Sequence, residues 1–386
     1  MSSLTAIRGA RIFDGQDWHD DAALLLEFGQ VSAIVASSAI PAHSETVHLD
    51  GGSVVPGFVD LQVNGGGGVL FNNDPSVDAI ATICAAHAQF GTTALLPTLI
   101  TDSVAVNIAA IAAGKAAYQQ RIPGFIGLHL EGPHLSLARK GTHDPALIRP
   151  MDEADLARLI AARDAVPNLL CTVAAETVTP QQIAALSAAG IVVSLGHTDA
   201  DSATASAAFA AGASMATHLF NAMSQLGSRE PGVVGAVLST ETVYAGLIAD
   251  GIHVHPATIA VALRAKSGPG RIFLVTDSMS QTGTDLTSFT LNGRTITRSG
   301  GALRLDNNTL AGADLDMIDA VEFMHSQVGL PFEEAVRMAS LYPAQAMGLD
   351  HSLGFLGPQS VASFVHLSDD RKVRSTWIDG VQVFSA

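Results

Sequence analysis

The stretch LLCTVAAETVTPQQIAALSAAGIVVSLGH, residues 169–197, contains one complete strand–helix–strand unit and therefore indicates the fold. Its two apolar runs, Leu169–Ala175 and Ile191–Leu195, do not alternate with polar residues, which is typical of a parallel sheet that is buried on both faces. Between them, Thr179 is suited to cap a helix that has proline in its first turn, and Gly190 is suited to end it. The second run leads directly into Gly-His, so the unit delivers a polar side chain at the carboxyl end of a strand.

The same pattern repeats outward from this unit, beginning at residue 56. Short apolar runs alternate with Ala-rich helical segments, which is the pattern of consecutive βα units. Eight such units are what a (β/α)8 TIM barrel requires. The predicted strands are Pro56–Val63, Thr93–Leu99, Phe125–Leu130, Leu169–Ala175, Ile191–Leu195, Ser214–Thr217, Tyr244–Ala249 and Ile272–Thr276.

The two ends of the chain have a different pattern, with short β-like runs and Gly-containing turns. Neither end can bury much surface alone, so we expect residues 1–55 and 355–386 to pair into one small β-sandwich domain. Residues 56–354 would then form the barrel domain. A β-hairpin excursion is expected over Leu286–Leu305, after the eighth strand.

Composition restricts the partners. The chain is 48% hydrophobic and 15% charged, with a formal net charge of −16, which argues against nucleic acid or an anionic membrane as a partner. A small anion is not excluded, because a local cation can outweigh a distant field. Cys84 and Cys171 lie in apolar stretches and are expected to be reduced core thiols. No signal peptide or membrane span is expected, so we predict a soluble cytoplasmic protein.

Four polar residues end apolar runs: Glu131, His197, His218 and Asp277. Two imidazoles and a carboxylate can hold one divalent metal and leave a position open for water, while a further carboxylate can move protons beside it. Each residue also has a structural alternative, since a strand-end His can simply be hydrogen-bonded, Glu131 can cap a loop and Asp277 can cap a helix. Their equivalent positions on successive strands favour a metal-dependent hydrolase.

Other candidate ligands fit less well. Many barrel hydrolases that bind two metals have a His-x-His pair on strand one and a carbamylated Lys on strand four, whereas this chain has Gln62, Asn64 and Glu176 at those places. We therefore expect one metal ion, with zinc preferred and iron, manganese or cobalt as alternatives. His129 is expected to point away from the site, and His134 to have no specific role there.

Seven motifs support a family resemblance: PGFVDLQVNG (56–65), HLEGP (129–133), KGTH (140–143), GHT (196–198), THLFNAM (217–223), DGIH (250–253) and TD (276–277). Each motif alone is weak, but together they cover nearly the whole chain in one order. This ordered set resembles the N-acetylglucosamine-6-phosphate deacetylases of the amidohydrolase superfamily. The resemblance implies a (β/α)8 barrel with a small β-sandwich, and release of acetate from the 2-acetamido group of a sugar phosphate.

The resemblance also implies roles for individual residues. Glu131, His197 and His218 would be metal ligands, Asp277 the general base and then acid, and His143 the donor that polarises the amide carbonyl. A homodimer is implied, because some phosphate ligands in this family come from the neighbouring subunit. The residues implied to bind substrate are Asn221, Ala222, Arg229 and His253 for the phosphate, and Leu310, Ala311 and Gly312 for the sugar.

The chain departs from the family pattern at two positions after this last group. Ala313 and Asp316 stand where the family usually has Ser and Thr. If Asp316 faces the sugar, N-acetylgalactosamine-6-phosphate or a related acylamino sugar becomes an alternative substrate. Two other readings are another amidohydrolase, such as a cyclic amidase or deaminase, and a catalytically silent barrel. The first would be expected to keep the strand-one His pair or the lysine, and the second to lose metal ligands.

Overall fold

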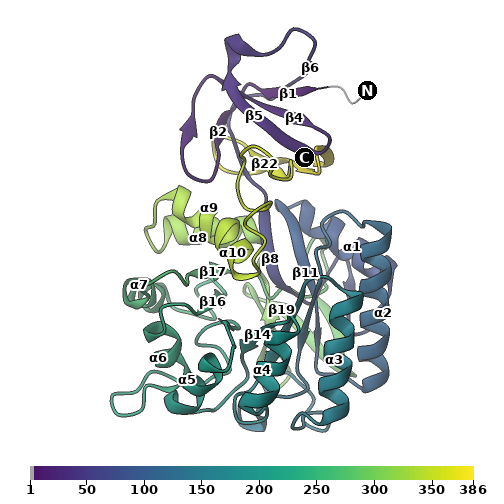
Figure 1. Cartoon of the computed structure of the whole chain (residues 1–386), viewed down its shortest axis with the longest axis vertical. Helices are drawn as coiled ribbons and strands as arrows, with labels where there is room; N and C mark the ends of the chain where they lie inside the picture. Colours follow the sequence, from purple (N-terminus) through teal and green to yellow (C-terminus); the bar gives the residue numbers. More distant parts are fainter. Residues whose placement is uncertain (1–3) are drawn as a thin grey trace.

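The computed structural model describes residues 4–386, so residues 1–3 of the segment considered for a signal peptide lie outside it. Its centre is a sheet of eight parallel strands in sequential order (Figure 1). The sheet closes into a barrel where Val63 bridges Ser278 and the Asn64 amide donates to the Ser278 carbonyl over 2.9 Å. All eight predicted strands are confirmed. They are β8 (Phe58–Val63), β11 (Thr92–Ile100), β12 (Leu128–Glu131), β13 (Leu169–Val173), β14 (Val192–Leu195), β15 (Met215–Ala216), β16 (Tyr244–Leu247) and β17 (Ile272–Leu274).

Helices connect these strands on the outside of the barrel, and their ends follow the predicted punctuation. The Thr179 hydroxyl accepts from the Gln182 amide at 3.2 Å, and the Gln182 side chain accepts from the Thr179 amide at 2.9 Å, which caps the helix reciprocally. Gly190 ends the same unit with φ +80°, a conformation that favours glycine. The barrel helices are α1 (Val77–Ala88), α2 (Val104–Gln120), α3 (Glu153–Ala165), α4 (Pro180–Ala188), α5 (Ser202–Ala210), α6 (Gly232–Ser239) and α7 (Pro256–Ala265).

The two chain ends form two further sheets above the barrel, as expected for a small β-sandwich (Figure 1). One sheet has the order β5-β4-β1-β6, and the other, β24-β23-β22-β7-β2-β3, combines strands from both ends. Leu24, Phe364 and Trp377 belong to the separate apolar core of this unit. The exact domain limits stay a prediction. The strands are β1 (Thr5–Arg8), β2 (Arg11–Phe13), β3 (Trp18–His19), β4 (Ala22–Glu27), β5 (Gln30–Ala36), β6 (Glu45–His48), β7 (Ser53–Pro56), β22 (Phe364–Leu367), β23 (Val373–Ile378) and β24 (Val381–Ser385).

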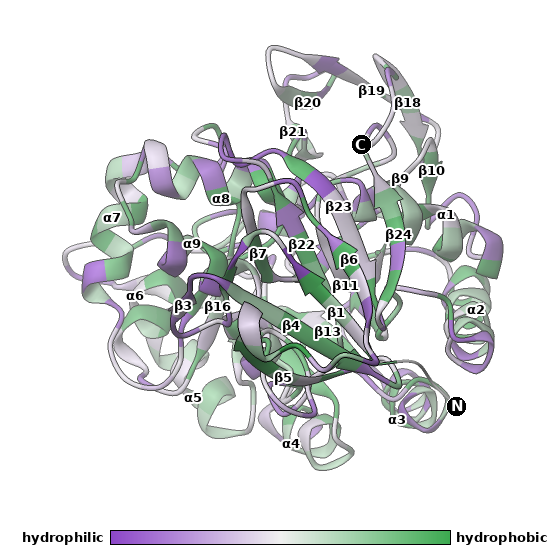
Figure 2. Ribbon diagram, turned by 90° about the horizontal axis from the view of Figure 1, so that it is seen from above, coloured by the Kyte–Doolittle hydropathy of each residue, from purple (hydrophilic) through white to green (hydrophobic). Residues whose placement is uncertain are grey.

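The excursion after β17 is larger than the predicted hairpin. It is a four-stranded antiparallel sheet of β18 (Ser288–Leu291), β19 (Arg294–Ser299), β20 (Ala302–Leu305) and β21 (Leu310–Ala313), which projects from the barrel in Figure 2. The last strand returns to the barrel, because the Ala313 amide donates to the Asp277 carbonyl over 2.8 Å. Three helices then lead to the C-terminal strands: α8 (Met317–Ser326), α9 (Phe332–Ala339) and α10 (Leu341–Ala346).

The two cysteines are buried and unpaired, as predicted. Burial raises the pKa of both thiols to about 12, so they are neutral core side chains. Within residues 4–386, none of the helices combines the length and apolar character needed to span a bilayer.

Candidate active site

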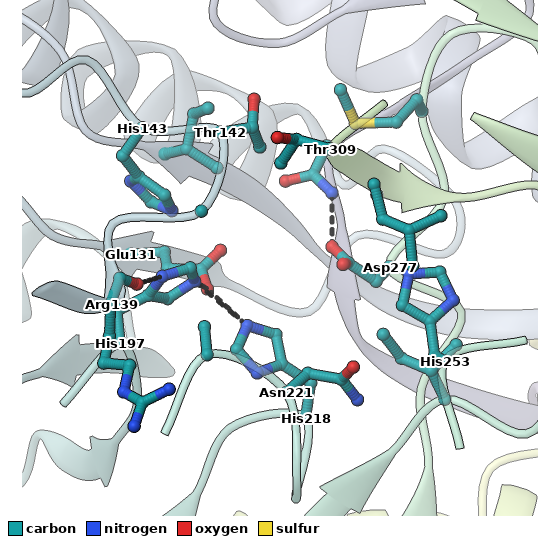
Figure 3. A pocket seen from close by; sticks show the side chains of 18 of the residues that line it. Glu131, Arg139, Thr142, His143, His197, His218, Asn221, His253, Asp277 and Thr309 are labelled. Carbon is teal, nitrogen blue, oxygen red and sulfur yellow. Dashed lines mark hydrogen bonds and ion pairs between the residues drawn. The ribbon is translucent and has the colours of Figure 1, made fainter. Parts of the chain in front are cut away.

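A cavity of about 350 Å³ opens at the carboxyl ends of the barrel strands, where the sequence predicts the functional side chains. Glu131 is the last residue of β12, while His197, His218 and Asp277 lie two or three residues beyond the ends of β14, β15 and β17. All four side chains line the cavity, and Figure 3 shows them converging from different strands. Because parallel strands all end at one rim of a barrel, residues far apart in sequence meet there.

Three of these side chains form a tight triangle of possible metal ligands. Oε1 of Glu131 lies 3.2 Å from Nε2 of His197 and 3.2 Å from Nε2 of His218, and the two nitrogens are 3.1 Å apart. Donor atoms that surround a tetrahedral metal at about 2.1 Å are separated from one another by about 3.4 Å. The spacing and the chemical types of the donors therefore fit one divalent metal ion.

Hydrogen bonds on the far side of the ring support this role for His197. Its Nδ1 lies 2.8 Å from the carbonyl oxygen of Arg139, which can only accept, so Nδ1 carries the proton and Nε2 presents its lone pair to the triangle. Burial alone would raise the pKa of Glu131, but hydrogen bonds and charges from His197 and His218 hold it well below its usual value. The carboxylate is therefore anionic and attracts a cation.

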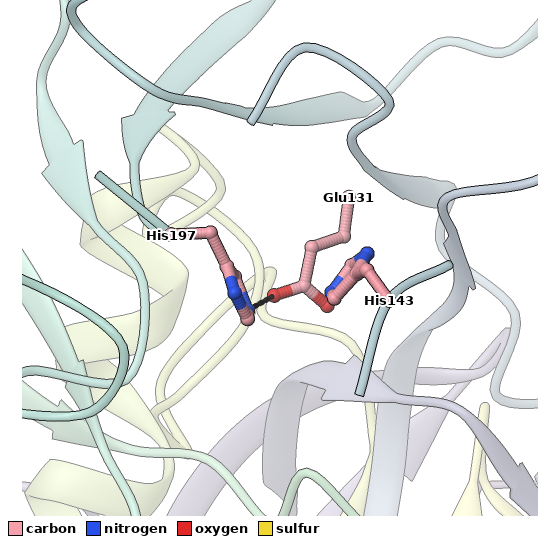
Figure 4. Close-up of side chains that lie close together, drawn as sticks. All are labelled: Glu131, His143 and His197. Atoms are coloured by element: carbon pink, nitrogen blue, oxygen red, sulfur yellow. Dashed lines mark ion pairs between the residues drawn. The ribbon is translucent and has the colours of Figure 1, made fainter. Parts of the chain in front are cut away.

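His143 lies close to the triangle, and one of its ring nitrogens is within 4.8 Å of the potential ligand atoms of Glu131 and His197 (Figure 4). Its hydrogen bonding is the opposite of that of His197. The backbone N–H of Thr101 donates to its Nδ1 over 3.3 Å, and the Thr101 hydroxyl, which can also donate, lies 2.8 Å from the same nitrogen. With Nδ1 as the acceptor, Nε2 carries the hydrogen. Burial, and then the charge of His197, hold the pKa of His143 well below its usual value. A neutral ring with Nε2–H is a hydrogen-bond donor rather than a metal ligand, which favours His218 as the third ligand.

Asp277 is held beside the triangle by two amide side chains of β8 and the residue after it. Asn64 Nδ2 donates to Oδ1 of Asp277 at 2.7 Å, and Gln62 Nε2 lies 3.2 Å from the same oxygen. Gln62 Nε2 also lies 3.3 Å from each carboxylate oxygen of Glu131, so one amide bridges the two acidic groups. Burial and the charge of Glu131 raise the pKa of Asp277 to about 6, a value suited to a group that both accepts and returns a proton.

The backbone is unusual at the same residues. His197, His218 and Asp277 have φ values of +48°, +31° and +49°, a backbone conformation that residues other than glycine rarely adopt. The Gln62 carbonyl accepts from the Asp277 amide over 3.0 Å, which helps to hold the last of these. Strained residues persist where surrounding contacts over-determine them, and they gather at functional sites.

Of the seven residues that the family resemblance assigns to substrate binding, five line the cavity and two do not. Asn221, Ala222, His253, Leu310 and Gly312 line the cavity. His253 is oriented by Asp250, whose Oδ2 accepts from its Nδ1 at 2.6 Å.

Two assigned residues do not line the cavity. Arg229 is exposed and lies outside the wall of this chain's cavity, and the Ala311 side chain is fully buried in a separate apolar cluster. Their substrate contacts stay predictions. Asp316 does not line the cavity either, because its side chain caps α8 by accepting from the Asp319 amide over 3.0 Å.

Several cavity residues were missed at the sequence level. Arg139, Thr142 and Thr309 line the cavity from loops or from the 3-10 turn Leu137–Arg139. Arg139 directly precedes the KGTH motif that contains His143, and this closeness in sequence could have indicated that Arg139 lies near the site. Gln62 and Asn64 were noted only as replacements for a missing His pair, and their contact with Asp277 depends on barrel closure.

Three residues considered as outer candidates have structural contacts. His129 shares the barrel-interior face with Glu131, because alternate residues of a strand point the same way, so the expectation that it points away was wrong. It bonds Thr172 Oγ1 over 2.7 Å and therefore keeps a structural role. Glu176 accepts from the Asp199 amide at 2.7 Å, and His134 bonds the Arg149 carbonyl at 3.2 Å outside the cavity wall.

Comparison with known sequences identifies one family model and several relatives that match nearly the whole chain. The model of the amidohydrolase family matches residues 53–383. The chain is 41% identical over 380 residues to an N-acetylgalactosamine-6-phosphate deacetylase of Shewanella sp. (strain ANA-3), covering 98% of this chain and 95% of that protein. It is 35% identical over 372 residues to an N-acetylglucosamine-6-phosphate deacetylase of Haemophilus influenzae, covering 96% of each.

A solved structure extends this similarity to three dimensions. The crystal structure of N-acetylglucosamine-6-phosphate deacetylase from Pasteurella multocida superimposes with a TM-score of 0.95 at 35% identity, covering 99% of this chain and 100% of that one. The fold, the position of the site at the strand ends and the sequence similarity, which extends over nearly the whole chain, all indicate the same family. This chain therefore belongs to the amidohydrolase family.

Proposed function

We propose that this protein is a metal-dependent deacetylase that hydrolyses N-acetylglucosamine-6-phosphate to glucosamine-6-phosphate and acetate. The observation that carries the proposal is the triangle of Glu131, His197 and His218 beside the carboxylate of Asp277. A carboxylate that can transfer protons and a metal site in one cavity are what hydrolysis of an unactivated amide needs. Relatives named for this reaction, at 35% identity over nearly the full chain, support the choice of substrate.

Glu131, His197 and His218 would hold one divalent metal ion. Zinc is the expected metal, with iron, manganese or cobalt as alternatives, because the same nitrogen and oxygen donors accept each of them. When bound, such a metal lowers the pKa of water from about 16 to about 7 and draws negative charge from a carbonyl oxygen.

The protein side chains supply the proton transfers. Asp277 accepts a proton from the attacking water as the water oxygen bonds to the acetamido carbon, and the Nε2–H of His143 donates to the carbonyl oxygen as it becomes negative. Asp277 then returns the proton to the nitrogen, and the C–N bond breaks to release acetate and the free amine. Because Asn64 and Gln62 bond Oδ1, the other carboxylate oxygen of Asp277 is the one free to move this proton.

The phosphate would bind at the opposite side of the cavity from the metal. Asp250 accepts from Nδ1 of His253, which leaves Nε2 free to contact the phosphate. Asn221 and Ala222 line the same cavity. Arg139 also lines the cavity, where its guanidinium is paired with Asp199 at 2.7 Å. We propose that Arg229 reaches the cavity of a partner subunit in a homodimer, since it lies outside the cavity of its own chain. We also retain cytoplasmic localisation as a prediction.

N-acetylgalactosamine-6-phosphate is the second candidate substrate. It is supported by the 41% identity to a deacetylase of that name. The charge of Asp316 does not provide the reason, because that side chain caps α8 away from the cavity. Discrimination between the two epimers would instead depend on Thr309, Leu310 and Gly312 of the cavity wall.

The deciding experiment is acetate release from both sugar phosphates and from unphosphorylated N-acetylglucosamine, with metal content measured on the same protein. Turnover of the glucosamine derivative in preference to the others, at about one metal per chain, is the expected result. Preference for the galactosamine derivative would identify N-acetylgalactosamine-6-phosphate, the second candidate, as the substrate. Failure of metal-replete protein to hydrolyse any of the three would overturn the deacetylase assignment.

A further inference from the structure

A second cavity, of about 560 Å³, lies between α7, α9, α10 and the start of β17. We call it the basic groove and define it by Arg264, Lys266, Arg271, Leu330, Met338 and Tyr342, all of which line it. Arg271 directly precedes β17, whereas Asp277 follows the carboxyl end of the same strand. The basic groove therefore opens at the opposite end of the barrel from the active site. Figure 1 shows α9 and α10 there, just below the small β-sandwich.

The basic groove brings three cationic side chains to one cavity of an acidic chain. Acidic residues outnumber Lys and Arg by 36 to 20, so a cation would be expected to find an acidic partner. Seven of the other 14 arginines do so. Within residues 4–386, no carboxylate lies within 4 Å of the charged groups of Arg264, Lys266 or Arg271. Glu334 also lines the groove, but it is engaged by the Tyr342 hydroxyl at 2.8 Å and by Arg337 at 3.2 Å.

The three cations have different amounts of free hydrogen-bonding capacity. Lys266 is anchored, since its Nζ donates to the Thr240 carbonyl at 2.8 Å and to two further carbonyls. Arg271 donates through Nη1 to the Gly268 carbonyl, and its guanidinium lies 5.8 Å from the centre of the Tyr342 ring. Arg264 makes no side-chain hydrogen bond with any of residues 4–386. The two guanidiniums therefore retain donors in the planar fork that suits a carboxylate, sulfonate or phosphate.

The cations also repel one another. Burial, and then the charge of Arg271, lower the pKa of Lys266. A bound anion would relieve this repulsion. The remaining wall is apolar, with Leu330, Met338 and the ring of Tyr342 facing the same space. A volume of this size is in the range of small-molecule sites, which combine an apolar wall with a few polar anchors.

We propose that the basic groove binds a small amphiphilic organic anion, with its anionic head on Arg264 and Arg271 and its apolar body against Leu330 and Met338. The proposal concerns a site separate from the active site. It does not rest on the proposed deacetylase function, because binding can be measured without turnover.

The test uses 8-anilinonaphthalene-1-sulfonate, a fluorescent probe that has a sulfonate head and an aromatic body. Saturable binding to the full-length protein is expected, and saturating sugar phosphate should not displace the probe. Arg271→Glu and Arg264→Glu should each weaken binding at least about ten-fold, as expected when a charge-assisted hydrogen bond is replaced by repulsion. Arg374→Glu is the matched control and should leave binding unchanged, since Arg374 is exposed on β23 and pairs with no carboxylate in the described part of the chain, residues 4–386.

The proposal would be overturned by the absence of saturable binding, by displacement of the probe by the sugar phosphate, or by equal weakening of binding in the control variant. Circular dichroism and sedimentation of each variant separate loss of the site from loss of fold or change of assembly. Milder Arg264→Gln and Arg271→Gln variants keep the test valid if a charge reversal fails to fold. A groove that serves instead as a contact between copies of the chain would show a changed oligomeric state in these variants, and this too would overturn the proposal.

Discussion

The side-chain amide of Asn64 holds the carboxylate of Asp277, with Nδ2 donating to Oδ1 over 2.7 Å. A carboxylate accepts and does not donate when ionised, so this contact sets the orientation of the Asn64 amide as well. The neighbouring amide of Gln62 reaches the same oxygen and also both oxygens of Glu131. Two neutral donors thus hold the proposed base, and one of them also bonds the proposed metal ligand, at the strand-one position where other barrel hydrolases have a His pair.

Replacement of Asn64 should impair catalysis more than binding. Asn64→Ala removes one charge-assisted hydrogen bond from Asp277, so kcat should fall about 10- to 100-fold while KM changes little. Steady-state kinetics with the sugar phosphate measure both constants. Asn73→Ala, at an exposed site whose side chain bonds the Thr290 carbonyl, is the control. A rise in KM with unchanged kcat would contradict a role in orienting Asp277.

Replacement of Asp277 should remove the proton transfers and leave the metal site intact. Asp277→Asn cannot accept a proton, and loss of general acid–base catalysis lowers rates by about 10²- to 10⁴-fold. Acetate release measures this loss, and metal analysis should still find the wild-type content. Substantial residual activity would mean that another group is the base.

The dependence on pH should follow Asp277. Its pKa is raised to about 6, so the carboxylate is ionised and able to act as base above this pH and is protonated and inactive below it. The profile of kcat/KM should therefore rise with pH and level off above about 6, and a bound cation nearby would move the limb to lower pH. Profiles measured at constant ionic strength check this. A limb that descends as pH rises through 6 would contradict the assignment.

Two histidine variants should distinguish the two possible ligand triads. His218→Ala removes a ligand and should lower both metal content and activity. His143→Ala removes a hydrogen-bond donor, so activity should fall while about one metal per chain remains. Metal analysis after dialysis is the measurement. Loss of metal in the His143 variant with retention in the His218 variant would reverse the assignment.

Arg229 provides a test for a shared active site. Arg229→Ala should raise KM for the sugar phosphate about 10- to 100-fold and leave unphosphorylated sugar unaffected, because one charge-assisted contact to phosphate is lost. If the contact crosses a dimer interface, mixing Arg229→Ala with Asp277→Asn should restore up to about a quarter of wild-type sites, since half the dimers would be mixed and each would hold one intact site. No recovery after verified subunit exchange would place Arg229 outside a shared site.

Much of the barrel could be predicted because its signals are local. The apolar runs that became β12, β14 and β17 are continuous and end in polar residues, so neither their type nor the side chain at their tip depends on the rest of the fold. The four-stranded sheet β18–β21 was only half predicted. Leu310–Ala313 has no strand signal of its own and becomes a strand by pairing with β20 beside the bridge from Ser278 to Ala313.

The sequence by itself determined the repeated βα pattern and the polar residues at the strand ends, and with them the family and the candidate metal ligands. Only the tertiary structure decided how these residues divide their roles. It placed the Arg139 carbonyl against His197 and the Thr101 amide against His143, and these contacts give the two rings opposite tautomers. It also turned Asp316 into a helix cap and left Arg229 outside its own cavity. Strand patterns arise from neighbours in sequence, whereas the proton position on a ring is set by whichever distant backbone group packs against it.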